Sequence, residues 1–337
     1  MRKSLILLLV VGLMFGSLGT ATASTESEPS SPPVLLDPNL PVYHPVDQLQ
    51  GELKLGGSNT LSHVAAVWID SFRQFYPDVK TSIDIIGSRQ AVVSVKSGQS
   101  HVGLLSRTIN QQEVDDFRKQ FGYPPTVLTP CLERTAIYVH RDNPIEGITL
   151  SEVDAMFSAE GRRGAEQPCR QWDQLGLTGR WANLPVVVHG RSKDTGSQIF
   201  IQQMVLLGGP LRADLQTHRT NLDMLRAVAA DPGAVGFAGL SYATADVRPV
   251  PLARAEGDKF VAIDSPEADQ GRYPLVRRLQ LVVNHDSKKQ LRPVEREFIK
   301  YVFSRLGQED VIKAGFQAIP ARPARVALDA VGLGVVR

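Results

Sequence analysis

Small polar residues crowd a turn at 56–60, where the sequence reads Gly-Gly-Ser-Asn-Thr directly ahead of an amphipathic stretch. Glycines let the backbone turn tightly, and Ser58, Asn59 and Thr60 are residue types that cap the start of a helix. A helix start presents unpaired N–H groups and the positive end of its dipole, so it can hold an anion. Taken alone, the turn is equally compatible with an ordinary capped helix.

Two other segments follow expected strands with the same kind of side chain. Gly87 and Ser88 come directly after one apolar strand, and Ser106 and Arg107 come directly after another. A charged arginine next to a buried strand needs a partner or solvent. Each segment has a plain alternative, namely a simple turn for the first and a surface arginine for the second.

The richest segment begins at Arg191 and reads Arg-Ser-Lys-Asp-Thr-Gly-Ser, just ahead of a further helix. Arg191 offers a guanidinium whose fork matches a tetrahedral oxyanion, while Thr195 and Ser197 offer hydroxyls and Gly196 an accessible N–H. Gly190 and Gly196 slightly resemble the glycines of a nucleotide-binding phosphate loop. However, five residues rather than four separate them, and no lysine follows Gly196, so nucleotide binding is rejected.

Considered together, the four segments indicate one ligand site. Open α/β sheets bind ligands beyond the carboxyl ends of their strands, and all four segments stand at such ends. They supply hydroxyl, N–H and guanidinium donors but no hydrophobic pocket. The sequence thus predicts a small, polar, anionic ligand that is held mainly by hydrogen bonds, with no metal and no cofactor.

The elements that must position these segments alternate between short apolar runs and helical stretches, which is typical of an α/β fold with a parallel sheet. Apolar residues spaced three and four apart predict a helix from Leu61 to Phe75. Further helices are expected around 199–207 and over 298–306. The expected strands are 53–55, 79–86, 101–105, 135–140, 184–189, 234–238 and 275–283.

With these segments the chain resembles the PstS-like phosphate-binding proteins of ABC importers, a branch of the type II periplasmic solute-binding proteins. The similarity runs in order from about residue 53 to residue 323 and includes the four segments above. Two more stretches carry it, Ala-Val-Gly-Phe at 234–237 and Gly-Phe-Gln-Ala-Ile-Pro at 315–320. The arginine segment is the most specific. Members of the family usually have Arg-x-x-x-Ser-Gly-Thr there, whereas Thr195 and Ser197 exchange the two hydroxyl residues here.

The resemblance implies a two-lobed α/β fold of the type II periplasmic-binding-protein class, with the ligand in a cleft between the lobes. The first lobe would comprise 51–133 and 275–326, and the second would comprise 134–274. The implied ligand is inorganic phosphate or a related oxyanion, and the implied partners are the permease and ATPase subunits of an ABC importer. The implied ligand-binding residues are Ser58, Asn59, Thr60, Ser88, Ser106 and Arg107 in the first lobe, and Arg191, Thr195, Gly196 and Ser197 in the second.

One departure from the family concerns selectivity. Well-studied phosphate receptors place an aspartate where this chain has Ser106 and Arg107, and that aspartate accepts the proton of hydrogen phosphate. Arginine has donors only, so we expect weaker rejection of sulfate here than a carboxylate would give. A binder of sulfate or another oxyanion therefore stays an alternative.

The N-terminus has the pattern of an export signal. Arg2 and Lys3 precede an apolar run of about a dozen residues, and Ala-Thr-Ala at 21–23 supplies the small residues that a signal peptidase reads. The run is shorter than the ~20 residues of a membrane-spanning helix. We therefore expect a signal peptide at 1–23 and a periplasmic location, with further secretion as the alternative. Proline and serine crowd 24–50, which predicts an extended linker or strap.

Two cysteines, Cys131 and Cys169, lie in the part that would be exported. An oxidising compartment favours pairing between them. We expect a disulfide, which would contribute about 3–4 kcal/mol in the chain-entropy model. Two buried thiols are the alternative.

Size, charge and motifs argue against other classes. A chain of 337 residues exceeds one ordinary core, and a formal net charge of +2 gives no indication of nucleic-acid binding. The signatures Gly-x-Ser-x-Gly and His-Glu-x-x-His are absent from the sequence and the histidines are scattered, so we expect no enzyme. We expect a monomer. A secreted scaffold or adhesion protein that has kept the fold for another use is the remaining alternative.

Overall fold

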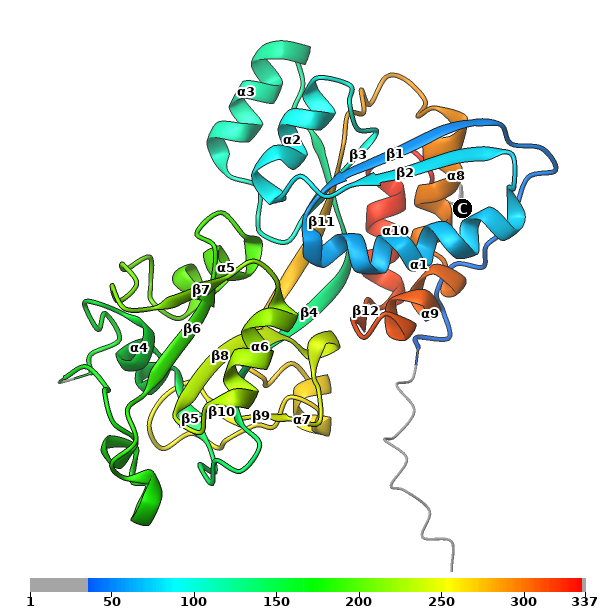
Figure 1. Ribbon diagram of the computed structural model, residues 1–337. Helices are drawn as coiled ribbons and strands as arrows, with labels where there is room; N and C mark the ends of the chain where they lie inside the picture. The colour runs from blue at the N-terminus through cyan, green and yellow to red at the C-terminus, as the bar shows by residue number, and fades with distance from the viewer. Residues whose placement is uncertain (1–35, 166, 335–337) are drawn as a thin grey trace, which may run out of the picture. The chain divides into compact units, whose positions relative to one another are not determined.

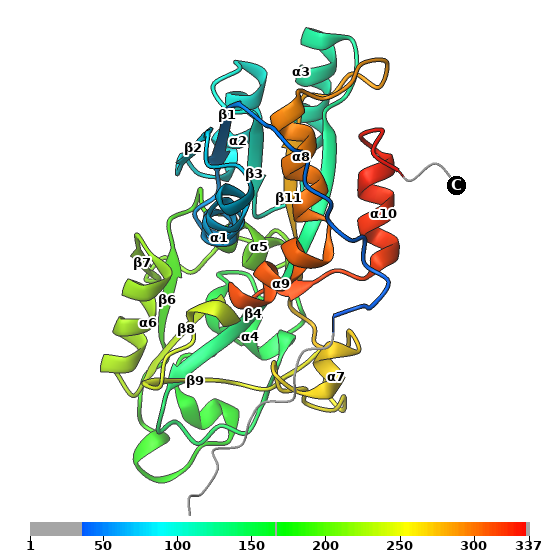
Figure 2. The ribbon, with the colours of Figure 1, turned by 90° about the vertical axis from the view of Figure 1, so that its right-hand side faces the viewer.

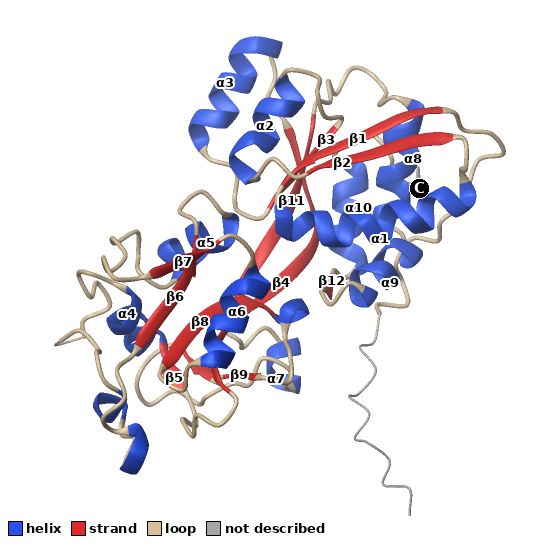
Figure 3. Cartoon of the chain, viewed as in Figure 1, coloured by secondary structure: helices blue, strands red, loops and turns tan. Residues whose placement is uncertain are grey.

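The computed structural model describes residues 36–165 and 167–334. The expected signal peptide, 1–23, and the first part of the segment rich in proline and serine lie outside these ranges. Helices flank the strands throughout the described chain (Figure 1, Figure 3). No helix within the two ranges is long and apolar enough to cross a membrane.

A large sheet runs through the described chain in the strand order β2-β1-β3-β11-β4-β8-β6-β7. Strands β2, β1 and β3 are parallel to one another, as are β8, β6 and β7, whereas β11 and β4 run antiparallel to their neighbours. The strands of this path are β1 (Gly51–Gly57), β2 (Val79–Asp84), β3 (Val102–Leu105), β4 (Thr126–His140), β6 (Val187–Arg191), β7 (Gln216–His218), β8 (Ala234–Gly239) and β11 (Val276–Val283). Strands off the path are β9 (Val247–Pro249) and β12 (Gln317–Ala318), which pair with β4, and β5 (Ile148–Thr149) and β10 (Leu252–Ala253), which pair with each other.

The helices pack on this sheet, with α1 and α2 against β1 and β3, α5 against β6, and α6 against β8 and β6. The α-helices are α1 (Asn59–Phe75), α2 (Ser88–Lys96), α3 (Gln111–Phe121), α4 (Leu150–Phe157), α5 (Gly196–Met204), α6 (Asn221–Ala230), α7 (Pro266–Asp269), α8 (Pro293–Val302), α9 (Arg305–Lys313) and α10 (Ala321–Asp329). Short 3₁₀ turns are η1 (Trp172–Leu175), η2 (Gly179–Trp181) and η3 (Leu240–Tyr242).

Two large hydrophobic cores organise the packing. One draws its buried residues from 40–131 and 279–331, and the other draws them from 136–275. We call the parts around them the first lobe and the second lobe. The two-lobed α/β fold expected from the sequence is confirmed. The expected lobe boundaries stay a prediction, because the chain from Leu36 onward forms one compact unit.

The long strand β4 belongs to both lobes (Figure 2). Its first part pairs with β11 as far as Arg134, and its second part pairs with β8 from Thr135 to Val139. Both β4 and β11 are largely buried along their length. The backbone ladder therefore continues from one lobe into the other without a loop between them.

Local sequence signals set the start and end of several helices. Ser58 caps α1 by accepting hydrogen bonds from the N–H groups of Thr60 and Leu61, so the helix begins at Asn59, two residues ahead of the Leu61 expected from the sequence. The expected continuous helix over 298–306 is wrong, because α8 ends at Val302 and α9 begins anew. Ser304 caps α9 by accepting from the Gly307 N–H at 3.3 Å.

The described part of the proline-rich segment lies along the first lobe. Tyr43 is buried, and its hydroxyl lies 2.8 Å from the hydroxyl of Tyr76. The same Tyr76 hydroxyl accepts from the Val46 N–H at 2.9 Å, and the Arg305 N–H donates to the Pro41 carbonyl at 2.8 Å. These contacts hold the stretch against the core through its backbone as well as its side chains.

The expected disulfide is wrong, because Cys131 and Cys169 are both free thiols. Cys131 lies on β4 and packs in the core of the first lobe, whereas Cys169 packs in the core of the second. Burial raises the pKa of the Cys169 thiol to about 11 and also raises the pKa of Cys131. Neither thiol is therefore ionised at neutral pH, and each behaves as a small apolar side chain.

Candidate functional site

Three of the expected residues, Ser58, Ser88 and Ser106, form a buried group that we call the serine cluster. Ser58 Oγ donates to Ser106 Oγ at 2.7 Å, and Ser88 Oγ lies 3.0 Å from Ser106 Oγ. The Ser106 N–H donates to Ser88 Oγ at 3.2 Å. The ends of β1 and β3 and the start of α2 thus meet at one point.

Two helices of the first lobe begin at the serine cluster. Ser58 is the N-cap of α1, and Asn59 and Thr60 form its first turn, the former exposed and the latter buried. Ser88 is the first residue of α2, and its N-cap Gly87 has a φ of 83°, a left-handed conformation that suits glycine. Both helix starts direct backbone N–H groups and a positive dipole end toward this region.

The second lobe adds a third helix start. Thr195 is the N-cap of α5, and its Oγ1 accepts from the Gln198 N–H at 3.4 Å. Gly196 packs so closely on the first lobe that a β-carbon there would collide with Ser106 Oγ. Ser197 is buried beside it. Gly196 of the second lobe therefore adjoins the serine cluster of the first, with Thr195 and Ser197 on either side of it along the chain.

The centre of this arrangement holds an arginine that the sequence analysis did not single out. Arg277 on β11 is 3% exposed. Its Nη2 donates to Thr60 Oγ1 at 3.3 Å and to Ser197 Oγ at 3.2 Å, and its Nη1 donates to the Ser106 carbonyl at 3.0 Å. One buried cation thus contacts the start of α1, the end of β3 and the start of α5.

The counter-ion of this arginine is Glu133 on β4, which is 1% exposed. The two residues lie directly opposite each other in the β4–β11 ladder, and Arg277 Nε donates to Glu133 Oε2. The sequence signal that could have revealed the pair is a glutamate within the apolar run of β4 and an arginine within that of β11. A charged side chain is rarely fully buried without a partner, so each predicts the other.

Arg191 ends β6 and is also buried. Its Nε donates to the His218 carbonyl at 3.2 Å, its Nη2 donates to the Arg219 carbonyl at 2.6 Å, and its Nη1 donates to Asn221 Oδ1. Burial lowers the pKa of the Arg191 guanidinium, which nevertheless stays charged at neutral pH. Arg191 is thus a buried cation of the second lobe, and it holds the segment that leads into α6.

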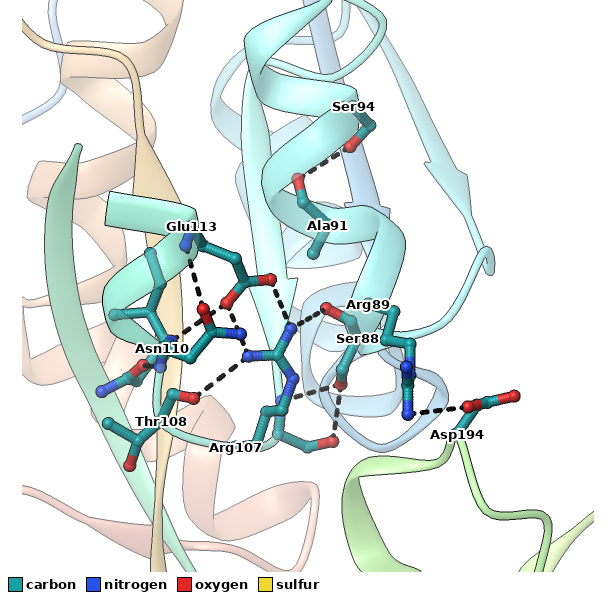
Figure 4. Close-up of polar contacts among 12 residues, drawn as sticks. Ser88, Arg89, Ala91, Ser94, Arg107, Thr108, Asn110, Glu113 and Asp194 are labelled. Atoms are coloured by element: carbon teal, nitrogen blue, oxygen red, sulfur yellow. Dashed lines mark hydrogen bonds and ion pairs between the residues drawn. The ribbon is translucent and has the colours of Figure 1, made fainter. Parts of the chain in front are cut away.

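Arg107 is engaged within the first lobe (Figure 4). Its Nη1 and Nη2 bind the two carboxylate oxygens of Glu113, at 2.8 Å and 2.6 Å. Nη1 also donates to the Thr108 carbonyl and Nη2 to the Ser88 carbonyl, each at 3.1 Å. The guanidinium therefore ties α3 to the start of α2, and the terminal nitrogens that could hold an anion already have partners.

An ion pair also crosses from one lobe to the other. Arg89 on α2 and Asp194, just ahead of α5, lie with Nη2 and Oδ1 2.9 Å apart (Figure 4). Their side chains are 61% and 55% exposed. The pair joins the rims of the two lobes in solvent, outside the buried arrangement around Arg277.

The combined geometry suits a small anion. Three helix starts, several hydroxyls and the buried Arg277 converge, against one buried carboxylate, and the buried Arg191 ends β6 in the second lobe. Guanidinium groups and helix N-termini are the donors that proteins use for tetrahedral oxyanions. Within 36–165 and 167–334, no group of three His, Cys, Asp or Glu side chains is placed to hold a metal ion.

Comparisons with known proteins agree with this geometry. A family model described as a PBP superfamily domain matches residues 43–305. The chain is 34% identical over 325 residues to the phosphate-binding protein PstS of Pseudomonas aeruginosa, a match that covers 96% of this chain and 98% of that protein.

Solved structures share the fold at lower identity. One is described as a candidate phosphate ABC transporter substrate-binding protein from Clostridium perfringens with bound phosphate. It matches with a TM-score of 0.64 at 23% identity, over 80% of this chain and 99% of that one. An ABC-type phosphate transport receptor from Vibrio cholerae matches with a TM-score of 0.62 at 17% identity, over 80% and 100%.

Proposed function

The chain belongs to the PstS-like branch of the PBP superfamily, and from that premise we propose that it binds inorganic phosphate where its two lobes meet. The binding residues would be those around the serine cluster, namely Ser58, Asn59, Thr60, Ser88, Ser106, Thr195, Gly196 and Ser197, with Arg191 and Arg277 as the cations. Arg107 would support the site through Ser88 instead of touching the ligand.

The observation that carries this proposal is the convergence of α1, α2 and α5 on Ser106 next to Arg277. Each of these helix starts has N–H groups without a helical acceptor, and a tetrahedral oxyanion can accept from several of them at once. Donors from both lobes would contact one ligand, so the ligand would favour the conformation in which the lobes touch.

The proposed setting is the periplasm, after removal of an export signal. There the protein would act as a monomer that delivers phosphate to the permease and ATPase subunits of an ABC importer. The similarity to PstS over nearly the whole chain supports this assignment. Among the residues that the structure describes, the site has donors for binding but no paired nucleophile and base, which supports a binding protein over an enzyme.

Isothermal titration of the exported chain with phosphate, arsenate, sulfate and molybdate tests the proposal. We expect saturable binding of one phosphate per chain, tighter than binding of sulfate or molybdate. Absence of binding to all four oxyanions would contradict the proposal and favour a secreted scaffold that has kept the fold. If sulfate binds more tightly than phosphate, sulfate and not phosphate is the ligand.

A further inference from the structure

Phosphate and sulfate differ at neutral pH mainly by one proton. Hydrogen phosphate and sulfate are both dianions of tetrahedral shape, but only hydrogen phosphate has a hydroxyl that can donate. A buried site that separates them needs a hydrogen-bond acceptor among its donors. Arg107 cannot serve, because a guanidinium only donates and its terminal nitrogens are bound to Glu113, Thr108 and Ser88.

Glu133 has a carboxylate oxygen that is buried and unpaired. Its Oε2 accepts from Arg277 Nε, but its Oε1 is shielded from solvent and has no hydrogen-bond partner among the described residues. An unsatisfied buried acceptor, above all a charged one, is costly in free energy. Such an oxygen is expected to find a donor in the working state of the protein.

Glu133 is linked to the proposed site through Arg277, which binds its other carboxylate oxygen, Oε2. Its partner Arg277 reaches Thr60 and Ser197, which lie in the first turns of the helices α1 and α5. On the other side lies Gly239, at the end of β8, where a β-carbon would collide with Glu133 Oε1. Any other residue at position 239 would displace the Glu133 carboxylate.

We propose that Glu133 Oε1 accepts a hydrogen bond from the hydroxyl of a monoprotonated tetrahedral oxyanion. This bond would make the site selective for phosphate and arsenate over sulfate. The inference rests on the proposed function. The hydroxyl of hydrogen phosphate supplies the missing donor, whereas sulfate brings an oxygen with a lone pair against a carboxylate. From the arginine at position 107 alone, we expected weak rejection of sulfate. With Glu133 as the acceptor, we expect strong rejection instead.

The first test needs no substitution. Fluorophosphate is a dianion at pH 7.5 with nearly the shape of hydrogen phosphate, but fluorine stands where phosphate has its hydroxyl. We expect native protein to bind fluorophosphate and sulfate about 10–100-fold more weakly than phosphate, the loss of one charge-assisted hydrogen bond. Arsenate, which keeps the proton, should bind within a few-fold of phosphate. Equal affinity for phosphate and fluorophosphate would overturn the proposal.

The second test is Glu133→Gln. The glutamine carbonyl can still accept from Arg277, but its amide donates where Oε1 accepted. We expect phosphate to bind about 10–100-fold more weakly and sulfate to bind as well as before or better, so that their affinity ratio collapses. An unchanged ratio with a uniform loss for both ligands would show that Glu133 only supports Arg277. Glu297→Gln is the matched control. Glu297 is 2% exposed and paired with Lys300, away from the serine cluster, and its substitution should leave the ratio unchanged.

The outcomes separate the two proposals. If native protein binds phosphate and the ratio survives Glu133→Gln, the proposed function stands and the role of Glu133 is wrong. If native protein binds phosphate and sulfate equally, oxyanion binding stands and the selectivity inference falls. If native protein binds none of these anions, both fall together.

Discussion

Arg107 and Glu113 form a two-pronged ion pair inside the first lobe, with side chains only 7% and 16% exposed. The same guanidinium donates to the Ser88 carbonyl at 3.1 Å. Glu113 also completes the capping box of α3 with Asn110. The start of α2, where the proposed anion site has its Ser88, is therefore held in place through a charge pair outside that site.

Replacing Glu113 with glutamine should destabilise the first lobe. The change leaves the charge of Arg107 mostly buried without its counter-ion, which should lower the free energy of unfolding by about 2–3 kcal/mol. Affinity for phosphate should fall only a few-fold, because Ser88 loses restraint but not its hydroxyl. Urea unfolding and titration calorimetry measure the two effects. The control is Asp115→Asn on the same helix, whose pair with Arg118 is about half exposed and should change stability by less than ~0.5 kcal/mol. Equal effects of the two variants would contradict the buried-pair argument.

Replacing Arg191 with lysine should abolish or strongly weaken phosphate binding. A lysine cannot reach the His218 and Arg219 carbonyls and Asn221 Oδ1 together, so the segment ahead of α6 loses its anchor. We expect at least a 10-fold loss of affinity, since a hydrogen bond to a charged group contributes about 1.5–3 kcal/mol. The comparison variant is Arg226→Lys on the exposed face of α6, which should bind like native protein. Native-like affinity of Arg191→Lys would contradict the role proposed for this arginine in phosphate binding.

The ion pair between Arg89 and Asp194 should favour the conformation in which the lobes touch, and only slightly. Both side chains are more than half exposed, so a double-mutant cycle with Arg89→Ala and Asp194→Ala should give a coupling of about 0.3–1 kcal/mol in phosphate binding. The coupling should shrink between about 0.05 M and 0.5 M salt because the charges are screened. A coupling that salt leaves unchanged would argue against a solvent-exposed contact.

His189 and His218 should make stability depend on pH. Their Nδ1 and Nε2 atoms lie 2.9 Å apart, and burial lowers the pKa of both rings, helped for His189 by the neighbouring His218. An unfolded histidine has a pKa of about 6.5, so below that pH the unfolded chain binds more protons than the folded one. Stability conferred by the neutral pair is therefore present above about pH 6.5 and is lost as the pH falls.

Melting temperatures from pH 7.5 to pH 5 measure this loss. His218→Gln should flatten the decline, because one of the two histidines no longer titrates, whereas the exposed His44→Gln should not. Parallel curves for native protein and His218→Gln would contradict the assignment.

The sequence predicted those parts of the fold and site that local rules govern. Ser58 and Thr195 are N-caps, and N-capping depends on residues within one helical turn. The buried run of β11 and the amphipathic spacing of α1 are likewise readable within a short window. The strand ends and helix starts around the serine cluster could therefore be predicted from the sequence.

The parts that the sequence left hidden depend on pairing between distant segments. Glu133 and Arg277 meet only because β4 and β11 align in one register, across a sequence separation of 144 residues. Arg107 follows β3, as the sequence predicted. Its acceptor Glu113 lies in the next helix, α3, and the sequence does not show that α3 places this carboxylate against Arg107. Two cysteines in a chain that we expect to be exported suggested a bridge, yet Cys131 and Cys169 pack in different hydrophobic cores.

Because one strand completes the sheet of both lobes, the lobes are not separable modules. Cutting the chain on either side of β4 would leave one lobe with an open row of unpaired backbone N–H and C=O groups, the kind of edge that drives aggregation. Mechanical load or heat that frees β4 from β8 would likewise weaken its hold on β11. The protein should therefore melt as a single cooperative body, and the amides of β4 should be among the last to exchange with solvent.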